Sequence, residues 1–126
     1  MNQTARDVTL LFLAVSAADR EIVKEEVFLM EKCSSDYGIR EEDWCKALNE
    51  SFVTYFNKGD AAVSAAILRL SKSLDKDQQK EFVEDLLAIA LADEIFHDNE
   101  KKIIKRVCKV FDVHFKVPVE FGINSV

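Results

Sequence analysis

Two segments of the chain, 13–26 and 87–100, carry the same pattern of residues. They read LAVSAADREIVKEE and LAIALADEIFHDNE. Five positions are identical at a constant offset (93 − 19 = 74): Leu13, Ala14, Ala18, Asp19 and Glu26 recur as Leu87, Ala88, Ala92, Asp93 and Glu100. Each copy is an apolar, small-residue run that ends in Ala-Asp, and a Glu then opens a second apolar-periodic run. This repeat predicts a duplicated helical hairpin with an Asp/Glu pair at the equivalent place in each copy.

The composition fits a single helical domain spanning residues 1–126, with repeat copies at about 8–39 and 82–113. The chain has only three glycines and one proline, which favours helices joined by short connections. Its formal net charge of −6 repels phosphate backbones and anionic lipid headgroups. We therefore expect no nucleic acid and no membrane insertion, and we expect a protein partner, a homo-oligomer or a cation instead.

Apolar residues at three- and four-residue spacing predict an all-α fold of six helices, or seven if the tail 114–126 adds one. The expected ranges are 4–18, 24–36, 41–57, 61–74, 76–92 and 98–111. The first and fifth helices are apolar on nearly all sides, so we expect them at the centre. We expect Gly38 to end the second helix in a left-handed conformation and Asp60 to cap the fourth. The tail departs from the duplication at Pro118, and we expect it to be extended or briefly helical.

Two further features of the chain bear on core and compartment. The third helix carries Trp44, Leu48, Phe52, Tyr55 and Phe56 at helical spacing. Three cysteines, Cys33, Cys45 and Cys108, lie in apolar helical patterns without a C-x-x-C pair, which indicates buried, reduced thiols in a cytoplasmic protein. The N-terminus is similar to a short secretory signal, but its pattern recurs at 82–92, so we interpret it as a core helix.

The segments AADREIVKEE (17–26) and LADEIFHDNE (91–100) resemble the A-A-D-G-x-I-x-x-x-E hallmark of the tellurite-resistance TerB-like family. That family also includes the N-terminal domain of a membrane-anchored J-domain co-chaperone. The resemblance covers residues 5–113 and implies an all-helical bundle with internal pseudo-twofold symmetry, acidic residues that bind metal ions, and a role in tellurite or stress resistance. The glycine after the aspartate is Arg20 in the first copy and Glu94 in the second, which suggests modified loops.

The acidic motifs predict either a metal site or a structural brace. Carboxylates that converge across the pseudo-twofold would suit Ca²⁺, Mg²⁺ or Mn²⁺ better than Zn²⁺. The candidate metal ligands are Asp19, Glu26, Asp93, Glu100, His97 and Asp98, with Glu21 and Asn99 as additions. Because Arg20 adds a cation beside Asp19, the second copy is the better site. In the alternative, each Glu reaches back to the N-cap backbone and each Asp accepts loop amides, so that both brace the hairpin and bind nothing.

The chain lacks the patterns that catalysis requires. Glu94 and His97 match the Glu-x-x-His pair of di-iron bundles, but the first copy has Val23 in place of the histidine. No serine has a histidine nearby in sequence, and no glycine-rich phosphate loop occurs. The charged runs KDQQKEFVED and EKKIIKRV are interpreted as solvated helix faces with internal charge pairs. We therefore expect a non-enzymatic domain that binds protein partners and a divalent cation, or else a co-chaperone-like adaptor whose acidic motifs bind no metal.

Overall fold

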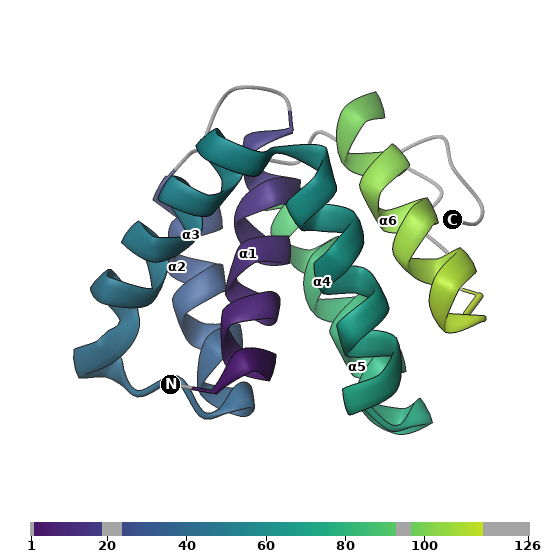
Figure 1. Ribbon diagram of the computed structural model, residues 1–126, viewed down its shortest axis with the longest axis horizontal. Helices are drawn as coiled ribbons and strands as arrows, with labels where there is room; N and C mark the ends of the chain where they lie inside the picture. Colours follow the sequence, from purple (N-terminus) through teal and green to yellow (C-terminus); the bar gives the residue numbers. More distant parts are fainter. Residues whose placement is uncertain (1, 19–23, 93–96, 115–126) are drawn as a thin grey trace.

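The computed structural model describes residues 2–18, 24–92 and 97–114 and forms a bundle of helices (Figure 1). The α-helices are α1 (Gln3–Ala17), α2 (Lys24–Ser34), α3 (Trp44–Lys58), α4 (Asp60–Ser73), α5 (Lys76–Ala90) and α6 (Asp98–Phe111), and the 3-10 helices are η1 (Ser35–Tyr37) and η2 (Glu41–Asp43). These ranges contain no strand. The prediction of an all-α fold with six helices is confirmed.

Helix α1 is the central element of the bundle. It packs against all five other α-helices, and α5 packs against α1, α2 and α6. Most side chains of α1 are buried, including the polar Asp7, Thr9 and Ser16. Figure 1 shows α1 between α3 and α4, with α6 at the outer edge. The two predicted hairpins, α1–α2 and α5–α6, therefore pack on each other, and their first helices form the core, as expected.

An aromatic cluster joins the two hairpins. The ring of Phe82 in α5 is fully buried, and its centroid lies 5.5 Å from that of Phe12 in α1. The same ring lies 5.8 Å from Tyr37 and 6.2 Å from Phe111. Tyr37 and Phe111 occupy equivalent positions of the duplication (111 − 37 = 74). One phenylalanine thus contacts the matching ring of each copy, and such ring pairs stabilise a core beyond the area they bury.

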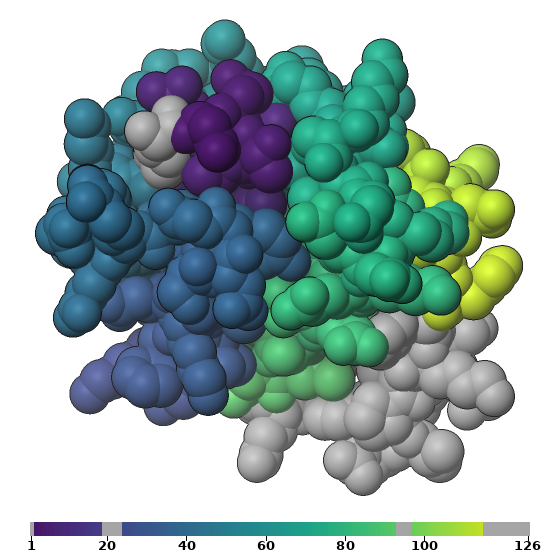
Figure 2. All heavy atoms as spheres, turned by 90° about the horizontal axis from the view of Figure 1, so that it is seen from below, coloured from purple at the N-terminus to yellow at the C-terminus, as the bar shows by residue number. Residues whose placement is uncertain are grey.

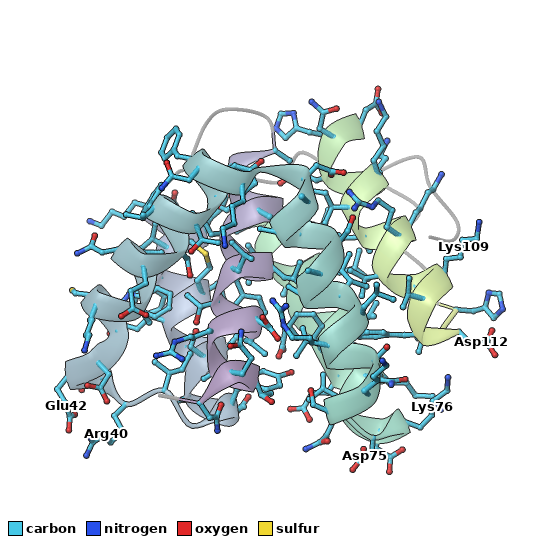
Figure 3. The ribbon with its side chains drawn as sticks, viewed as in Figure 1. Arg40, Glu42, Asp75, Lys76, Lys109 and Asp112 are labelled. Atoms are coloured by element: carbon cyan, nitrogen blue, oxygen red, sulfur yellow. The ribbon has the colours of Figure 1, made fainter. Side chains whose placement is uncertain are left out.

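The helical segment that closes each copy, η1 after α2 in the first and α6 in the second, ends with the same backbone geometry. Gly38 has a left-handed φ of 83°, as predicted, and its amide donates to the carbonyl of Ser35. Its counterpart, Asp112 (112 − 38 = 74), is also left-handed, with a φ of 56°. Lys76 binds the C-terminal end of α6. Its Nζ donates to the carbonyl of Phe111 at 2.5 Å and to that of Asp112 at 2.9 Å (Figure 3).

One expectation about a helix end is wrong, and one apolar row has both a buried and an exposed part. Asp60 does not cap α4: Gly59 is the N-cap, and the Asp60 carboxylate instead accepts from Arg106 Nη1 at 2.6 Å. The apolar row of α3 runs from the core to the surface, because Phe56 lies about 120° around the helix from Trp44 at ~100° per residue. Trp44 is 5% exposed and Phe56 is 81% exposed.

The three cysteines are unpaired and differ in exposure. Cys108 is buried, Cys33 is half-buried, and Cys45 is exposed on α3. The expectation of buried thiols is therefore wrong for Cys45, which stands on the outer side of the helix that carries Phe56.

Candidate functional site

The glutamates of the two acidic motifs are buried at equivalent places. Glu26 is the third residue of α2, and Glu100 is the third residue of α6. Each is 1% exposed, whereas glutamates usually lie at the surface. A carboxylate in the first turn of a helix is favoured by the free backbone amides and the positive end of the helix dipole. The duplication has therefore placed one buried carboxylate at the start of the second helix of each hairpin.

Glu100 binds the backbone at the start of its own helix. The amide of His97 donates to Glu100 Oε1 at 2.9 Å. His97 is half-buried and precedes α6 with extended backbone angles, φ −73° and ψ 148°. This is the reaching-back contact of a capping box, in which a glutamate three positions into a helix satisfies the amide of the N-cap residue.

Glu26 accepts a hydrogen bond from the preceding helix. The hydroxyl of Ser16 in α1 donates to Glu26 Oε2 at 2.5 Å, and both side chains are buried. At the equivalent position the second copy has Ala90 (90 − 16 = 74), which offers no donor. Sequence reasoning missed Ser16, although a signal existed: it is the polar residue within the apolar stretch LAVSAA.

One contact brings the two motifs together. The side-chain amide of Asn99, in the first turn of α6, donates to the carbonyl of Ala18 at 3.1 Å. Ala18 directly precedes Asp19 in the first motif, so the start of α6 lies against the end of α1. The predicted ligands Asp19, Glu21 and Asp93 lie outside the described residues, and so does the predicted convergence of all four carboxylates.

Asp98 differs from the buried glutamates. Its side chain is 90% exposed, and its carboxylate lies 3.4 Å from Lys101 Nζ. Within 2–18, 24–92 and 97–114, no three His, Cys, Asp or Glu side chains gather closely enough to hold a metal ion. The part of the chain that is described thus brings His97 and Glu100 together and leaves Asp98 at the surface.

A second polar cluster joins η1 to α5. The Tyr37 hydroxyl donates to Asp85 Oδ2 at 3.2 Å. Burial raises the pKa of the Asp85 carboxyl to about 6, although the Tyr37 hydrogen bond acts in the opposite direction. Burial, reinforced by the charge of Asp85, raises the pKa of the Cys33 thiol to about 12. The thiol is therefore protonated at neutral pH and is not an activated nucleophile.

An ion pair between the buried Asp7 and the half-exposed Arg69 ties α1 to α4. The guanidinium of Arg69 donates to Asp7 through Nε at 2.9 Å and Nη2 at 2.9 Å, and Gln3 Nε2 adds a bond at 3.0 Å. Asp7 is 2% exposed and lines a cavity of about 580 Å³ with Leu10 and other residues of α1, α3 and α4. Figure 2 shows the purple first turns of α1 at the surface of the molecule. Because both carboxylate oxygens are occupied, the pair serves as a structural tie.

Among the described helices, none combines the length and the apolar composition that crossing a lipid bilayer requires. Neither the curated proteins nor the solved structures include a match to this chain. A family model does match: that of the tellurite resistance protein TerB aligns with residues 5–116 and spans both acidic motifs and all six helices. The chain therefore belongs to the TerB family.

Proposed function

We propose that this TerB-family chain is a non-enzymatic, cytoplasmic domain that acts in tellurite or stress resistance by binding protein partners. It holds a divalent cation, Ca²⁺, Mg²⁺ or Mn²⁺, at the acidic motifs between the hairpins. The family membership supports the resistance setting. Three unpaired cysteines, one of them exposed, fit a reducing compartment.

The observation that carries the cation proposal is the pair of buried glutamates, Glu26 and Glu100. A carboxylate taken out of water needs compensating charge or hydrogen bonds, and hard oxygen ligands are those that Ca²⁺, Mg²⁺ and Mn²⁺ prefer. Each glutamate follows a motif aspartate, Asp19 or Asp93, by seven residues. The second motif is the better site, because Arg20 follows the first aspartate and would compete with the ion.

Thermal unfolding with and without Ca²⁺, Mg²⁺, Mn²⁺ and Zn²⁺ tests the cation proposal. At one hundred times its dissociation constant, an ion that binds only the folded chain adds about 2.7 kcal/mol of stability. The Asp19→Asn/Asp93→Asn variant should lose this response. The exposed pair Asp77→Asn/Glu84→Gln makes the same change in charge and should keep it. The absence of any ion-dependent shift in the native chain would rule out a cation at these motifs.

A second candidate is an adaptor domain whose acidic motifs brace the hairpins and bind no metal. The bonds from the His97 amide to Glu100 and from the Ser16 hydroxyl to Glu26 favour it. In this case Glu100→Gln lowers the free energy of unfolding equally in chelator and in each metal. A loss of stability that appears only when metal is present would instead favour the cation site.

Iron loading tests the non-enzymatic part of the proposal. The Glu94 and His97 pair is the one feature that di-iron chemistry would use, and the first copy lacks its partner histidine. After loading with ferrous iron and exposure to air, the protein is expected to stay colourless in ultraviolet–visible spectra. An oxo-bridged iron band would contradict the proposal.

A further inference from the structure

The outer face of α6 is a row of lysines in an otherwise acidic protein. From 101 to 111 the helix holds five cationic residues and no carboxylate. Lys102, Lys105 and Lys109 recur at three- and four-residue spacing and are exposed, while Ile104, Val107 and Phe111 face the core. Figure 3 shows Lys109 on the outer side of α6, opposite the end of the molecule that carries Arg40 and Glu42. The three lysines form one row, about 10 Å long at ~1.5 Å per residue.

These three lysines do not take part in the ion pairs that hold α6 to the rest of the described structure. The other cations of the helix have partners, because Lys101 pairs with Asp98 and Arg106 pairs with Asp60 and the hydroxyl of Ser64. Within the described ranges, Lys102, Lys105 and Lys109 form no ion pair. The expectation of charge pairs within the run EKKIIKRV therefore fails for Lys102 and Lys105. With α6 at +3, the rest of the chain carries −9 (−6 − 3 = −9).

An apolar edge adjoins the lysine row. Val110 in α6 is 42% exposed, and Leu68 in α4 is 56% exposed. Figure 1 shows α4 and α6 side by side and running in the same direction, and the two helices are in contact. Leu68 follows Ser64 by one turn, and Val110 follows Arg106 by one turn, so both continue the line of the Arg106–Ser64 contact. The row thus has an apolar border on its α4 side.

We propose that this surface, made of Lys102, Lys105, Lys109, Leu68 and Val110, binds an acidic amphipathic helix of a partner protein. Two turns of such a helix would match the length of the row, with carboxylates on the lysines and apolar side chains on Leu68 and Val110. This inference rests on the proposed role in partner binding. It does not depend on the cation proposal.

The charge of the rest of the molecule selects a short acidic partner over a polyanion. A nucleic acid or an anionic membrane extends well beyond a 10 Å row (~two helical turns) and meets the acidic remainder of the surface. Three lysines also release few counterions, so non-specific binding of a duplex is weak. A short acidic helix contacts the row without reaching the repulsive surroundings.

Fluorescence anisotropy with a labelled synthetic peptide tests the proposal on the full chain. The probe is a 15-residue helix (~four turns) of Glu, Leu and Ala, with glutamates and leucines on adjacent faces. Its control has the same composition in scrambled order. The test variant is Lys102→Glu/Lys105→Glu/Lys109→Glu. Its matched control, Lys46→Glu/Lys72→Glu/Lys80→Glu, changes three other exposed lysines and the same net charge. Circular dichroism checks that both variants fold.

The expected result is that the native chain binds the amphipathic peptide and prefers it to the scrambled one. Exposed ion pairs each contribute roughly 1.5- to 5-fold in affinity, so the α6 variant should weaken binding about tenfold or more and the control variant far less. Affinity should also fall as salt rises. Equal weakening in both variants would overturn the proposal, as would tighter binding of a DNA duplex or phosphatidylserine vesicles through the same lysines. Failure to bind the peptide would overturn it too, and the metal titration would still stand by itself.

Discussion

The two hairpins, α1–α2 and α5–α6, bury an equivalent glutamate, and the first copy holds it with a donor that the second copy lacks. Glu100 accepts from the backbone amide of His97, at the start of its own helix. Glu26 accepts from the hydroxyl of Ser16, on the preceding helix. The duplication has therefore kept the glutamate, while the Ser16 hydroxyl of the first copy is replaced by the methyl group of Ala90 in the second. The constant element is a buried glutamate side chain at a helix N-terminus, which both the brace and the cation site require.

The outer faces of the two hairpins differ more than their buried faces. Helix α2 mixes Lys24, Glu25, Glu31 and Lys32, whereas α6 carries a row of lysines without carboxylates beyond its first turn. In a duplicated domain, packing restrains the inner face of each copy, while the outer face is free to diverge. The divergent face of α6 is for this reason the place where a function particular to this chain is expected.

The largest expected difference between the copies lies in the core. Phe82 contacts Phe12, Tyr37 and Phe111, and the first copy has Val8 at the same position (82 − 8 = 74). Both are fully buried. Phe82→Ala should lower the free energy of unfolding by about 3–5 kcal/mol, and Val8→Ala by about 2 kcal/mol. Urea unfolding measures both, and equal costs would contradict a joining role for Phe82.

The donor to Glu26 provides the next largest effect. Ser16→Ala removes a hydrogen bond to a buried carboxylate and should lower the free energy of unfolding by about 1.5–3 kcal/mol. A double-mutant cycle with Glu26→Gln isolates the coupling between the two side chains. Ser34→Ala is the matched control, because the buried Ser34 hydroxyl donates to the neutral carbonyl of Met30. A coupling near zero would mean that Ser16 does not hold Glu26.

A pH-dependent effect should distinguish Asp85 from its counterpart Leu11 (85 − 11 = 74). Burial raises the pKa of the Asp85 carboxyl in the folded chain from its ordinary value of 3.8 to about 6. The free energy of unfolding therefore falls as the pH rises from about 3.8 to about 6, because the unfolded chain ionises first. Asp85→Asn should therefore stabilise the chain at neutral pH by about 1 kcal/mol, a figure reduced because the carboxyl is only half-buried. Urea unfolding near pH 7.5 and near pH 3.5 checks this, and an equal gain at both would exclude ionisation as the cause.

The smallest expected effects concern the left-handed residues that end the two hairpins. Gly38→Ala should cost about 1 kcal/mol from backbone strain alone, since no atom lies within 4 Å of an added Cβ. Asp112→Gly should raise the free energy of unfolding by about 0.5–1 kcal/mol, because glycine adopts that φ without strain. Thermal unfolding compares the two, and a destabilising Asp112→Gly would mean that the aspartate side chain contributes more than its backbone costs.

Periodic features of the molecule could be predicted from the sequence. The six helices, the central position of α1 and α5, and the Gly38 turn follow from apolar spacing and local backbone preferences. These signals arise between residues that are close together in the sequence, so the sequence alone reveals them. The buried glutamates were also found as candidates, because the repeat marked their positions twice.

Features that depend on contacts between helices could not be predicted. Asp60 was expected to cap α4, but Arg106, 46 residues away, binds its carboxylate. The Ser16 hydroxyl becomes a partner of Glu26 only once α1 and α2 pack together. The net charge of −6 is a sum over the whole chain, so it does not show that α6 carries a row of lysines. Tertiary packing decides each of these cases.

The cation site at the acidic motifs can be tested directly by Mn²⁺ binding, followed through the loss of the free-ion signal in electron paramagnetic resonance. The native chain should bind Mn²⁺, and Glu100→Gln should weaken binding about tenfold or more, as losses around metal sites usually do. Glu26→Gln, at the motif where Arg20 follows the aspartate, should weaken it far less. A native chain that leaves the Mn²⁺ signal unchanged would contradict a cation site at these motifs. A Glu26→Gln variant that loses as much affinity as Glu100→Gln would contradict the preference for the second motif.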